Sequence, residues 1–140
     1  MRFTSILITL VAAFSCLTNS TLTAEDVAIV LDRETTLPVE HGITQIEQTF
    51  LDQGFSTKRC GASNDENADF FLLAGIASMD GEAVEILNRD DIELPELPES
   101  LVIHLTTVRD KPTIVLCGSD ERALMYAALD TAERIASANG

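Results

Sequence analysis

Residues 112–135, PTIVLCGSDERALMYAALDTAERI, decide the fold because they contain a strand and a helix joined by a short turn. The apolar run Pro112–Cys117 is short, continuous and rich in β-branched residues, which predicts a buried strand. Apolar residues then recur at helical spacing, at Leu124, Ala128, Ala132 and Ile135. This stripe predicts an amphipathic helix that packs on the sheet. We expect Val115 or Cys117 to lie beneath it.

The start of this helix carries residues that are typical of a helix N-terminus. Ser119 is the predicted N-cap, and Gly118 turns the chain before it. Asp120 and Glu121 follow in the first turn, where the helix dipole stabilises acidic side chains. Arg122 comes next, and we expect it to pair with a nearby acid such as Glu99.

Further strands precede this stretch. They are predicted at Val27–Leu31, Phe55–Cys60, Phe70–Ile76 and Leu101–Thr107, of which the first and third are strongly apolar. Arg109-Asp110-Lys111 form the predicted turn of a hairpin that joins the last of these runs to Pro112–Cys117. Residues 61–67 and 90–99 are polar or proline-containing and are expected to be loops.

A second long helix is predicted between the first two strands. Thr36 is its expected N-cap, Pro38 lies in its first turn, and Gly54 ends it. Its apolar stripe consists of Val39, Ile43, Ile46 and Phe50. A short helix is also expected at residues 82–87.

This order of elements predicts the fold class. We expect an α/β fold (an α+β two-layer sandwich) with one mixed sheet of about five strands and two long helices on one face. Neither an internal repeat nor a low-complexity tract divides the chain. Residues 25–140 are therefore expected to form a single domain.

Residues 1–24 have the layout of a secretory signal peptide. Arg2 gives a positive start, and the apolar run Ile6–Phe14 follows it. This run is too short to span a bilayer, which takes ~20 residues. We therefore expect export to the periplasm or the outside of the cell, with cleavage between Ser20 and Glu25.

The charge of the chain disfavours several classes of partner. Nine basic residues stand against 23 acidic ones, for a formal net charge of −14 over 140 residues. Phosphate backbones and anionic lipid headgroups repel such a chain. Nucleic acid is therefore not an expected partner, and neither is a membrane after signal cleavage.

The cysteines leave two interpretations open. Cys16 is lost with the signal peptide, unless it carries a lipid, for which Phe14 fits the recognition pattern poorly. Cys60 and Cys117 each end a predicted strand and precede Gly. They form a disulfide if their strands are neighbours that end at the same edge, and otherwise they are separate buried thiols.

No metal or cofactor is expected. His41 and His104 fall on different predicted elements and have no second ligand at metal spacing. The acidic stretches at 64–69 and 90–99 lack the spacing of a calcium loop. We find neither a glycine loop for phosphate nor a serine nucleophile motif.

A motif spans the last hairpin and helix. Its residues are Glu99 and Ser100 before a strand, and then Gly118, Asp120, Arg122, Tyr126 and Ala127. This pattern resembles the N-terminal α/β domain that precedes the catalytic barrel in bacterial-type β-hexosaminidases and α-glucuronidases. Ala123 stands where that family has Gly, and Ala is close in size and favours a helix.

The resemblance implies a non-catalytic role, because the catalytic groups of such enzymes lie on the barrel. We expect an exported accessory domain of glycoside hydrolase type, either stand-alone or a fragment without its barrel, with a glycosidase catalytic barrel as its partner. No catalytic residue is assigned, and Glu99, Gly118, Asp120, Arg122 and Tyr126 are expected to be structural. The sugar and the oligomeric state are left open.

Two alternatives remain. The chain is a small secreted binding protein that uses the same fold, or it is a glycosidase in its own right. An apolar patch on the sheet face away from the long helices favours the accessory domain, because a docking surface must be apolar. A pocket lined by two or more carboxylates favours the enzyme. Asp120-Glu121 looks like the catalytic Asp-Glu pair of hexosaminidases, but this match is too short to assign them that role.

Overall fold

The computed structural model describes residues 25–138, and the predicted signal peptide lies outside the described residues. The elements, in chain order, are β1 (Asp26–Leu31), α2 (Leu37–Asp52), β2 (Ser56–Cys60), β3 (Phe70–Ile76), α3 (Glu82–Arg89), β4 (Leu101–Val108), β5 (Lys111–Gly118) and α4 (Glu121–Ala138). The strands form one five-stranded sheet in the order β2-β1-β3-β5-β4. Only the β4–β5 pair is antiparallel, so the predicted mixed sheet and α/β class are confirmed.

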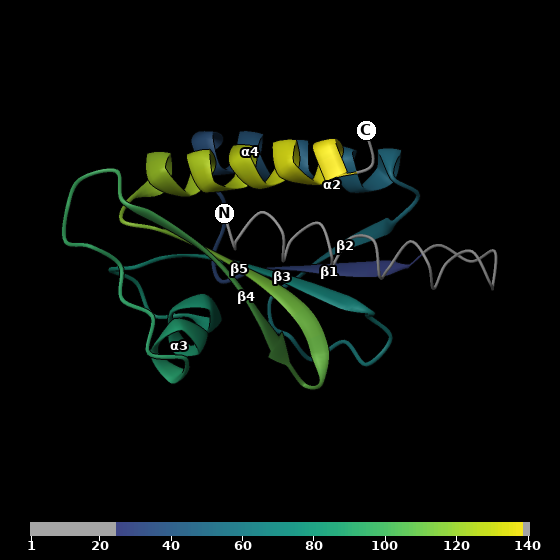
Figure 1. The fold of residues 1–140 in the computed structure, drawn as a ribbon, viewed down its shortest axis with the longest axis horizontal. Coiled ribbons are helices and arrows are strands. Elements are labelled where there is room, and N and C mark those ends of the chain that lie inside the picture. The colour runs from purple at the N-terminus through teal and green to yellow at the C-terminus, as the bar shows by residue number, and fades with distance from the viewer. Residues whose placement is uncertain (1–24, 139–140) are drawn as a thin grey trace.

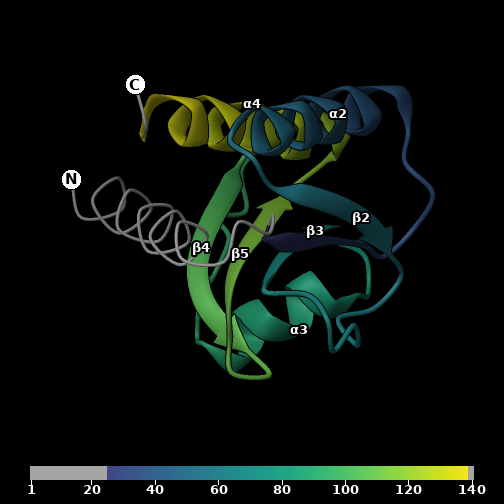
Figure 2. The ribbon, with the colours of Figure 1, turned by 90° about the vertical axis from the view of Figure 1, so that its right-hand side faces the viewer.

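The long helices α2 and α4 lie side by side on one face of the sheet, as predicted (Figures 1 and 2). The short helix α3 lies on the opposite face and buries Ala83 and Leu87 there. The sheet therefore has two apolar layers, one on each face. The predicted sandwich had assigned no cover to this second face, and α3 provides it.

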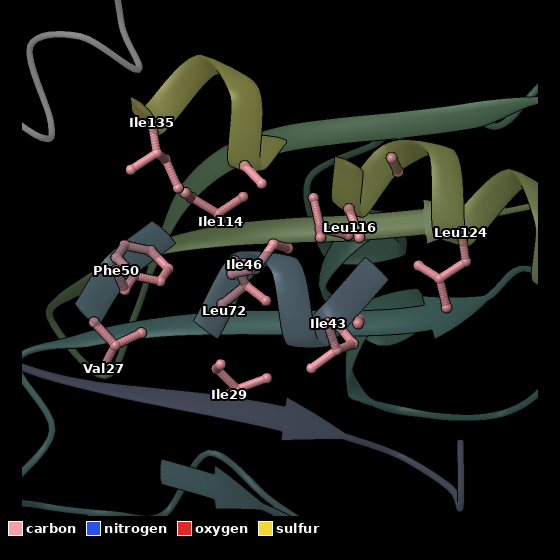
Figure 3. Packing of buried hydrophobic residues seen from close by; sticks show 14 of the residues in the cluster. Val27, Ile29, Ile43, Ile46, Phe50, Leu72, Ile114, Leu116, Leu124 and Ile135 are labelled. Carbon is pink, nitrogen blue, oxygen red and sulfur yellow. The ribbon is translucent and has the colours of Figure 1, made fainter. Parts of the chain in front are cut away.

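The core between the sheet and the long helices contains both predicted stripes. All of their residues are buried: Val39, Ile43, Ile46 and Phe50 on α2, and Leu124, Ala128, Ala132 and Ile135 on α4. Figure 3 shows Ile114 and Leu116 of β5 among them. Phe50 also packs edge-to-face against Phe55 and Phe70, with ring centroids 5.4 and 5.8 Å apart.

The prediction that Val115 or Cys117 lies beneath α4 is wrong. Both residues belong to the cluster on the α3 side, whereas Ile114 and Leu116 face α4. Successive side chains of a strand point to opposite faces, so an error of one residue reverses the assignment. β5 is buried on both faces from Thr113 to Gly118, and its sequence therefore has no polar alternation that marks the inner face.

The ends of α2 agree with the sequence. Thr36 is the N-cap residue, although its side chain makes no capping hydrogen bond, and Pro38 lies in the first turn. Gly54 follows the helix with φ +91°, a left-handed conformation that glycine adopts without strain. Gly42 lies where α2 meets α4, and a Cβ atom there would lie 2.8 Å from the Cβ of Ala128.

The predicted hairpin is present and turns at Arg109-Asp110. Both residues have positive φ, 53° and 63°, as the type I′ turns of two-residue hairpins require. The register pairs Val108 with Lys111 and Leu101 with Gly118. This hairpin places β4 at one edge of the sheet.

The cysteines are free thiols on separate strands, so the structure does not support the disulfide. Cys60 pairs with Val30 on β1, and Cys117 pairs with Gly75 on β3. Since β1 and β3 lie between β2 and β5, the two cysteines are roughly 14 Å apart, three strand spacings, and a disulfide needs Cα atoms within about 7 Å. Burial raises the pKa of the Cys117 thiol to about 11.

An ion-pair cluster joins α2 to the edge strand β2. The Arg59 guanidinium binds Glu40 and Glu47 of α2, with 2.8 Å between nitrogen and oxygen in each pair. The hydrogen bonds from Arg59 lower the pKa of the Glu40 carboxyl to about 2. This contact therefore stabilises the fold above the ordinary carboxyl range, and it is lost as the pH falls toward about 2.

We expect Glu40→Gln to reduce the loss of stability between about pH 6 and about pH 3. The Arg59 and Glu40 side chains are 34% and 42% exposed, so the difference should be roughly 1 kcal/mol or less. Urea unfolding at the two pH values measures it, with the exposed Glu133→Gln as the control. Equal pH dependence in Glu40→Gln and the parent would contradict a stabilising role for this pair.

Candidate functional site

The motif residues form the corner between β5 and α4. Asp120 is the side chain that caps α4, because its Oδ1 accepts a hydrogen bond from the N–H of Ala123 at 2.8 Å. The prediction of Ser119 as the cap is therefore wrong by one residue. Ser119 instead joins the two strands, since its Oγ accepts from the N–H of Ser100 at 3.0 Å.

We expect Asp120→Ala to destabilise the fold by about 1 kcal/mol, the usual cost of losing a helix cap. Asp120→Asn retains a side-chain oxygen acceptor and should recover most of this loss. Thermal or urea unfolding of the two variants measures the difference. A larger loss for Ser119→Ala than for Asp120→Ala would return the capping role to Ser119.

Gly118 has a steric role in the same corner. A Cβ atom at this position would overlap the backbone nitrogen of Leu124 and would lie 2.8 Å from the backbone of Ala123 and Asp120. Only glycine lets β5 end this close to the first turn of α4. The corner therefore fixes the angle at which α4 crosses the sheet.

Arg122 and Tyr126 are the exposed motif residues on α4 itself. Arg122 Nη1 lies 3.1 Å from Glu99 Oε1, which confirms the predicted ion pair. These side chains are 65% and 49% exposed, so the pair adds little stability. Tyr126 lies one helical turn further along α4 and is 44% exposed. The motif thus combines residues that shape the corner, Gly118 and Asp120, with the exposed Arg122 and Tyr126 on α4.

A pocket of about 160 Å³ lies at the carboxyl ends of β1 and β3. It is lined by Leu31, Asp32, Arg33, Glu34, Thr35, Thr36, Val39, Ala74, Gly75, Ile76, Met79, Asp80, Glu121 and Leu124. From β1 the chain crosses through α2 to β2 on one side, whereas β3 lies on the other side of β1. This change of direction is the place where open parallel sheets most often bind ligands.

We call this cavity the switch-point pocket. Four residues with carboxylate side chains line it, namely Asp32, Glu34, Asp80 and Glu121. Asp32 also fixes α3, because its Oδ1 accepts from the N–H of Glu82 at 3.1 Å. Burial raises the pKa of the Asp32 carboxyl, and the nearby Glu82 and Glu85 carboxylates raise it further, against the lowering effect of the α3 backbone N–H groups. An acid in such a setting holds its proton more readily than an exposed one.

The sequence separated the residues that the fold brings together here. Asp32 directly follows the predicted strand Val27–Leu31, and neither it nor Asp80 was assigned a role from the sequence. The available signal was an acid directly after an apolar parallel strand, but only the strand order shows which strand ends meet. Of the pair Asp120-Glu121, the structure uses Asp120 as the helix cap and places Glu121 at the pocket.

A second, more open hollow of about 800 Å³ lies between α3 and the acidic loop. Val84, Leu87, Ile92 and Leu94 contribute its apolar part, while Glu93 and Glu96 contribute charge. It lies beside the sheet face on which an apolar patch would favour the accessory domain. That face is covered by α3 and its neighbours, with Val115 and Cys117 fully buried, so it does not offer such a patch.

The remaining candidate metal ligands are the histidine and acidic side chains, for which the sequence predicts no metal site. His104 Nε2 lies 2.8 Å from Asp90 Oδ2, and Asp90 also binds Arg89. The hydrogen bonds from Arg89 and His104 hold the pKa of the Asp90 carboxyl well below its usual range. Within residues 25–138, no group of three or more His, Cys, Asp or Glu is placed to hold a metal ion. None of the helices in that range is long and apolar enough to cross a bilayer.

No family model matches the sequence, and no curated protein is significantly similar to it. The likeness to the β-hexosaminidase and α-glucuronidase domain therefore rests on the motif residues and on the order of the elements around them.

Proposed function

We propose that the chain is an exported, non-catalytic α/β module of glycoside hydrolase type that docks on a glycosidase catalytic barrel. The observation that carries the proposal is that some motif residues shape the β5–α4 corner while others present exposed side chains. Gly118 and Asp120 build the β5–α4 corner, and neither lines the switch-point pocket. A motif that shapes a helix and presents two exposed side chains suits docking better than catalysis.

The docking surface that we propose is the outer side of the first turns of α4. Arg122 and Tyr126 are four residues apart, so they lie on the same side of this helix. Tyr126 is the exposed aromatic side chain of the described region, where all four phenylalanines are buried. Tyr and Arg are the residue types that most often dominate binding energy at interfaces.

The experiment uses a β-hexosaminidase or α-glucuronidase barrel that lacks its own N-terminal domain. Sedimentation should detect a complex with the purified chain. Tyr126→Ala should weaken it at least about 10-fold, as expected for an interface hot spot. Glu133→Ala changes another exposed residue of α4 and serves as the control. Absence of binding to either barrel, or equal binding by Tyr126→Ala, would overturn the proposal.

A second candidate is a glycosidase site in the switch-point pocket. The four carboxylate residues and the raised pKa of Asp32 favour it, because glycoside hydrolysis uses one protonated acid and one carboxylate. A panel of aryl glycosides, including N-acetylglucosaminide and glucuronide, tests it. We expect no turnover from the isolated chain. Turnover that is abolished by both Asp32→Asn and Glu121→Gln would show that the chain is an enzyme rather than a docking module.

A further inference from the structure

The two edges of the sheet differ in their protection against other strands. β2 is five residues long, and its Lys58 and Arg59 side chains form ion pairs with Asp65, Glu40 and Glu47. Charged residues and short length are the usual means of blocking an edge. The β4 edge has eight residues, Leu101–Val108, and none of them is Asp, Glu, Lys, Arg or Pro.

The hydrogen-bonding direction of β4 follows from its pairing with β5. The N–H of Ser119 donates to the carbonyl of Ser100 at 2.8 Å, so this pair is of the hydrogen-bonded type. Such pairs recur at every second residue of an antiparallel ladder. The backbone groups of Leu101, Ile103 and Leu105 therefore point away from β5.

The end of the β4 edge near Thr107 already has a hydrogen-bond partner within the chain. Arg89 Nη2 donates to the carbonyl of Thr107 at 3.0 Å, which agrees with an outward direction for the odd-numbered residues. From Leu101 to Leu105, no hydrogen bond to the outward backbone groups is present within residues 25–138. The open part of the edge is thus centred on Ile103.

The side chains along this open part are apolar and only partly covered. Leu101, Ile103 and Leu105 pack against the outer margin of the core beneath the long helices, and each remains partly exposed. A strand laid against β4 would cover these three side chains and satisfy the outward N–H and C=O groups together.

We propose that a second copy of this chain pairs with it through β4, edge to edge and antiparallel. Antiparallel pairing of one strand with its copy is self-complementary, so a two-fold axis near Ile103 lets both chains use the same surface. The uncharged edge suits this occupant in particular. Two acidic molecules can approach there, because Leu101–Val108 contain no Asp or Glu and the Asp90 carboxylate beside His104 is paired with Arg89.

Assembly through β4 stops at a dimer. Within residues 25–138 each chain offers one open sheet edge, because β2 is blocked, so a third copy has no edge to pair with. The contact is small, and we expect a reversible dimer rather than an obligate one. Its association should strengthen with added salt, because salt screens the repulsion between the two acidic molecules. An interface held by ion pairs would respond in the opposite direction.

Sedimentation equilibrium over a range of protein and salt concentrations tests the proposal. The parent should pass from monomer to dimer, and Ile103→Lys should weaken association at least about 10-fold by placing two like charges at the axis. Ile103→Pro is the second variant, because it removes an N–H that β5 does not use and so leaves the β4–β5 ladder intact. Far-UV circular dichroism verifies that both variants fold.

Thr57→Lys places the same charge on the β2 edge and is the matched control, which should dimerise like the parent. A parent that stays monomeric at all concentrations would overturn the proposal. So would species larger than a dimer, or a dimer that resists both Ile103→Lys and Ile103→Pro. The test involves no glycosidase, so its failure is independent of the docking function proposed above.

Discussion

Leu124→Ala should lower the free energy of unfolding by roughly 2–5 kcal/mol. Leu124 is 3% exposed and packs in the core between α4 and the sheet, near Leu116 and Ile43 (Figure 3). Truncation removes the buried methyl groups and leaves a cavity, because the helix cannot move toward the sheet without displacing its neighbours. Small domains have only ~5–15 kcal/mol of stability, so the urea midpoint should fall clearly.

Glu121→Gln is the matched change in the same helical turn. If Glu121 acts only through the helix dipole, neutralising it should cost about 0.3–1 kcal/mol. Glu121 also lines the pocket that contains Asp32, Glu34 and Asp80. A clear gain in stability would mean that these acids repel each other in the folded state, which is typical of a functional site. A Leu124→Ala midpoint equal to that of the parent would show that the core assignment of this helix face is wrong.

The sequence was most informative where a helix has one apolar stripe. Val39, Ile43, Ile46 and Phe50 alternate with polar residues at helical spacing, and all four are buried. The hairpin was equally clear, because Arg109-Asp110 interrupt two apolar runs. In each case the pattern is local, and burial on one side of an element leaves its trace in the order of the residues.

The face of β5 could not be predicted in this way. Its residues from Thr113 to Gly118 are buried by α4 on one side and by the α3 layer on the other. Selection for apolar side chains then acts at every position, and the period of two disappears. The assignment of Val115 and Cys117 to the α4 side had no physical signal behind it.

The switch-point pocket was hidden for a different reason. Asp32 and Asp80 are far apart in the sequence, and they meet because β3 lies beside β1 rather than beside β2. Strand order is a property of the whole chain, and neither apolar runs nor turn residues specify it. The distance between Cys60 and Cys117 depends on the same order, which is why the disulfide was left open.

Gly118→Ala should destabilise the protein by roughly 3 kcal/mol, although it adds a single methyl group. The new Cβ atom would meet backbone atoms of Ala123, Leu124 and Asp120, and backbone cannot rotate away as a flexible side chain can. Relief requires α4 to shift away from the end of β5, which would loosen the contacts of Leu124 and the cap at Asp120 together.

Gly61→Ala is the control, because a Cβ atom at Gly61 has no atom within 4 Å. This change should be neutral or should stabilise the fold by up to about 1 kcal/mol, because alanine lowers the conformational entropy of the unfolded chain. Equal urea midpoints for the two variants would show that the corner tolerates a larger residue. If Gly118→Ala does displace α4, it also moves Arg122 and Tyr126. Binding to a glycosidase barrel should then weaken even at temperatures where the variant is fully folded, whereas Gly61→Ala should bind like the parent.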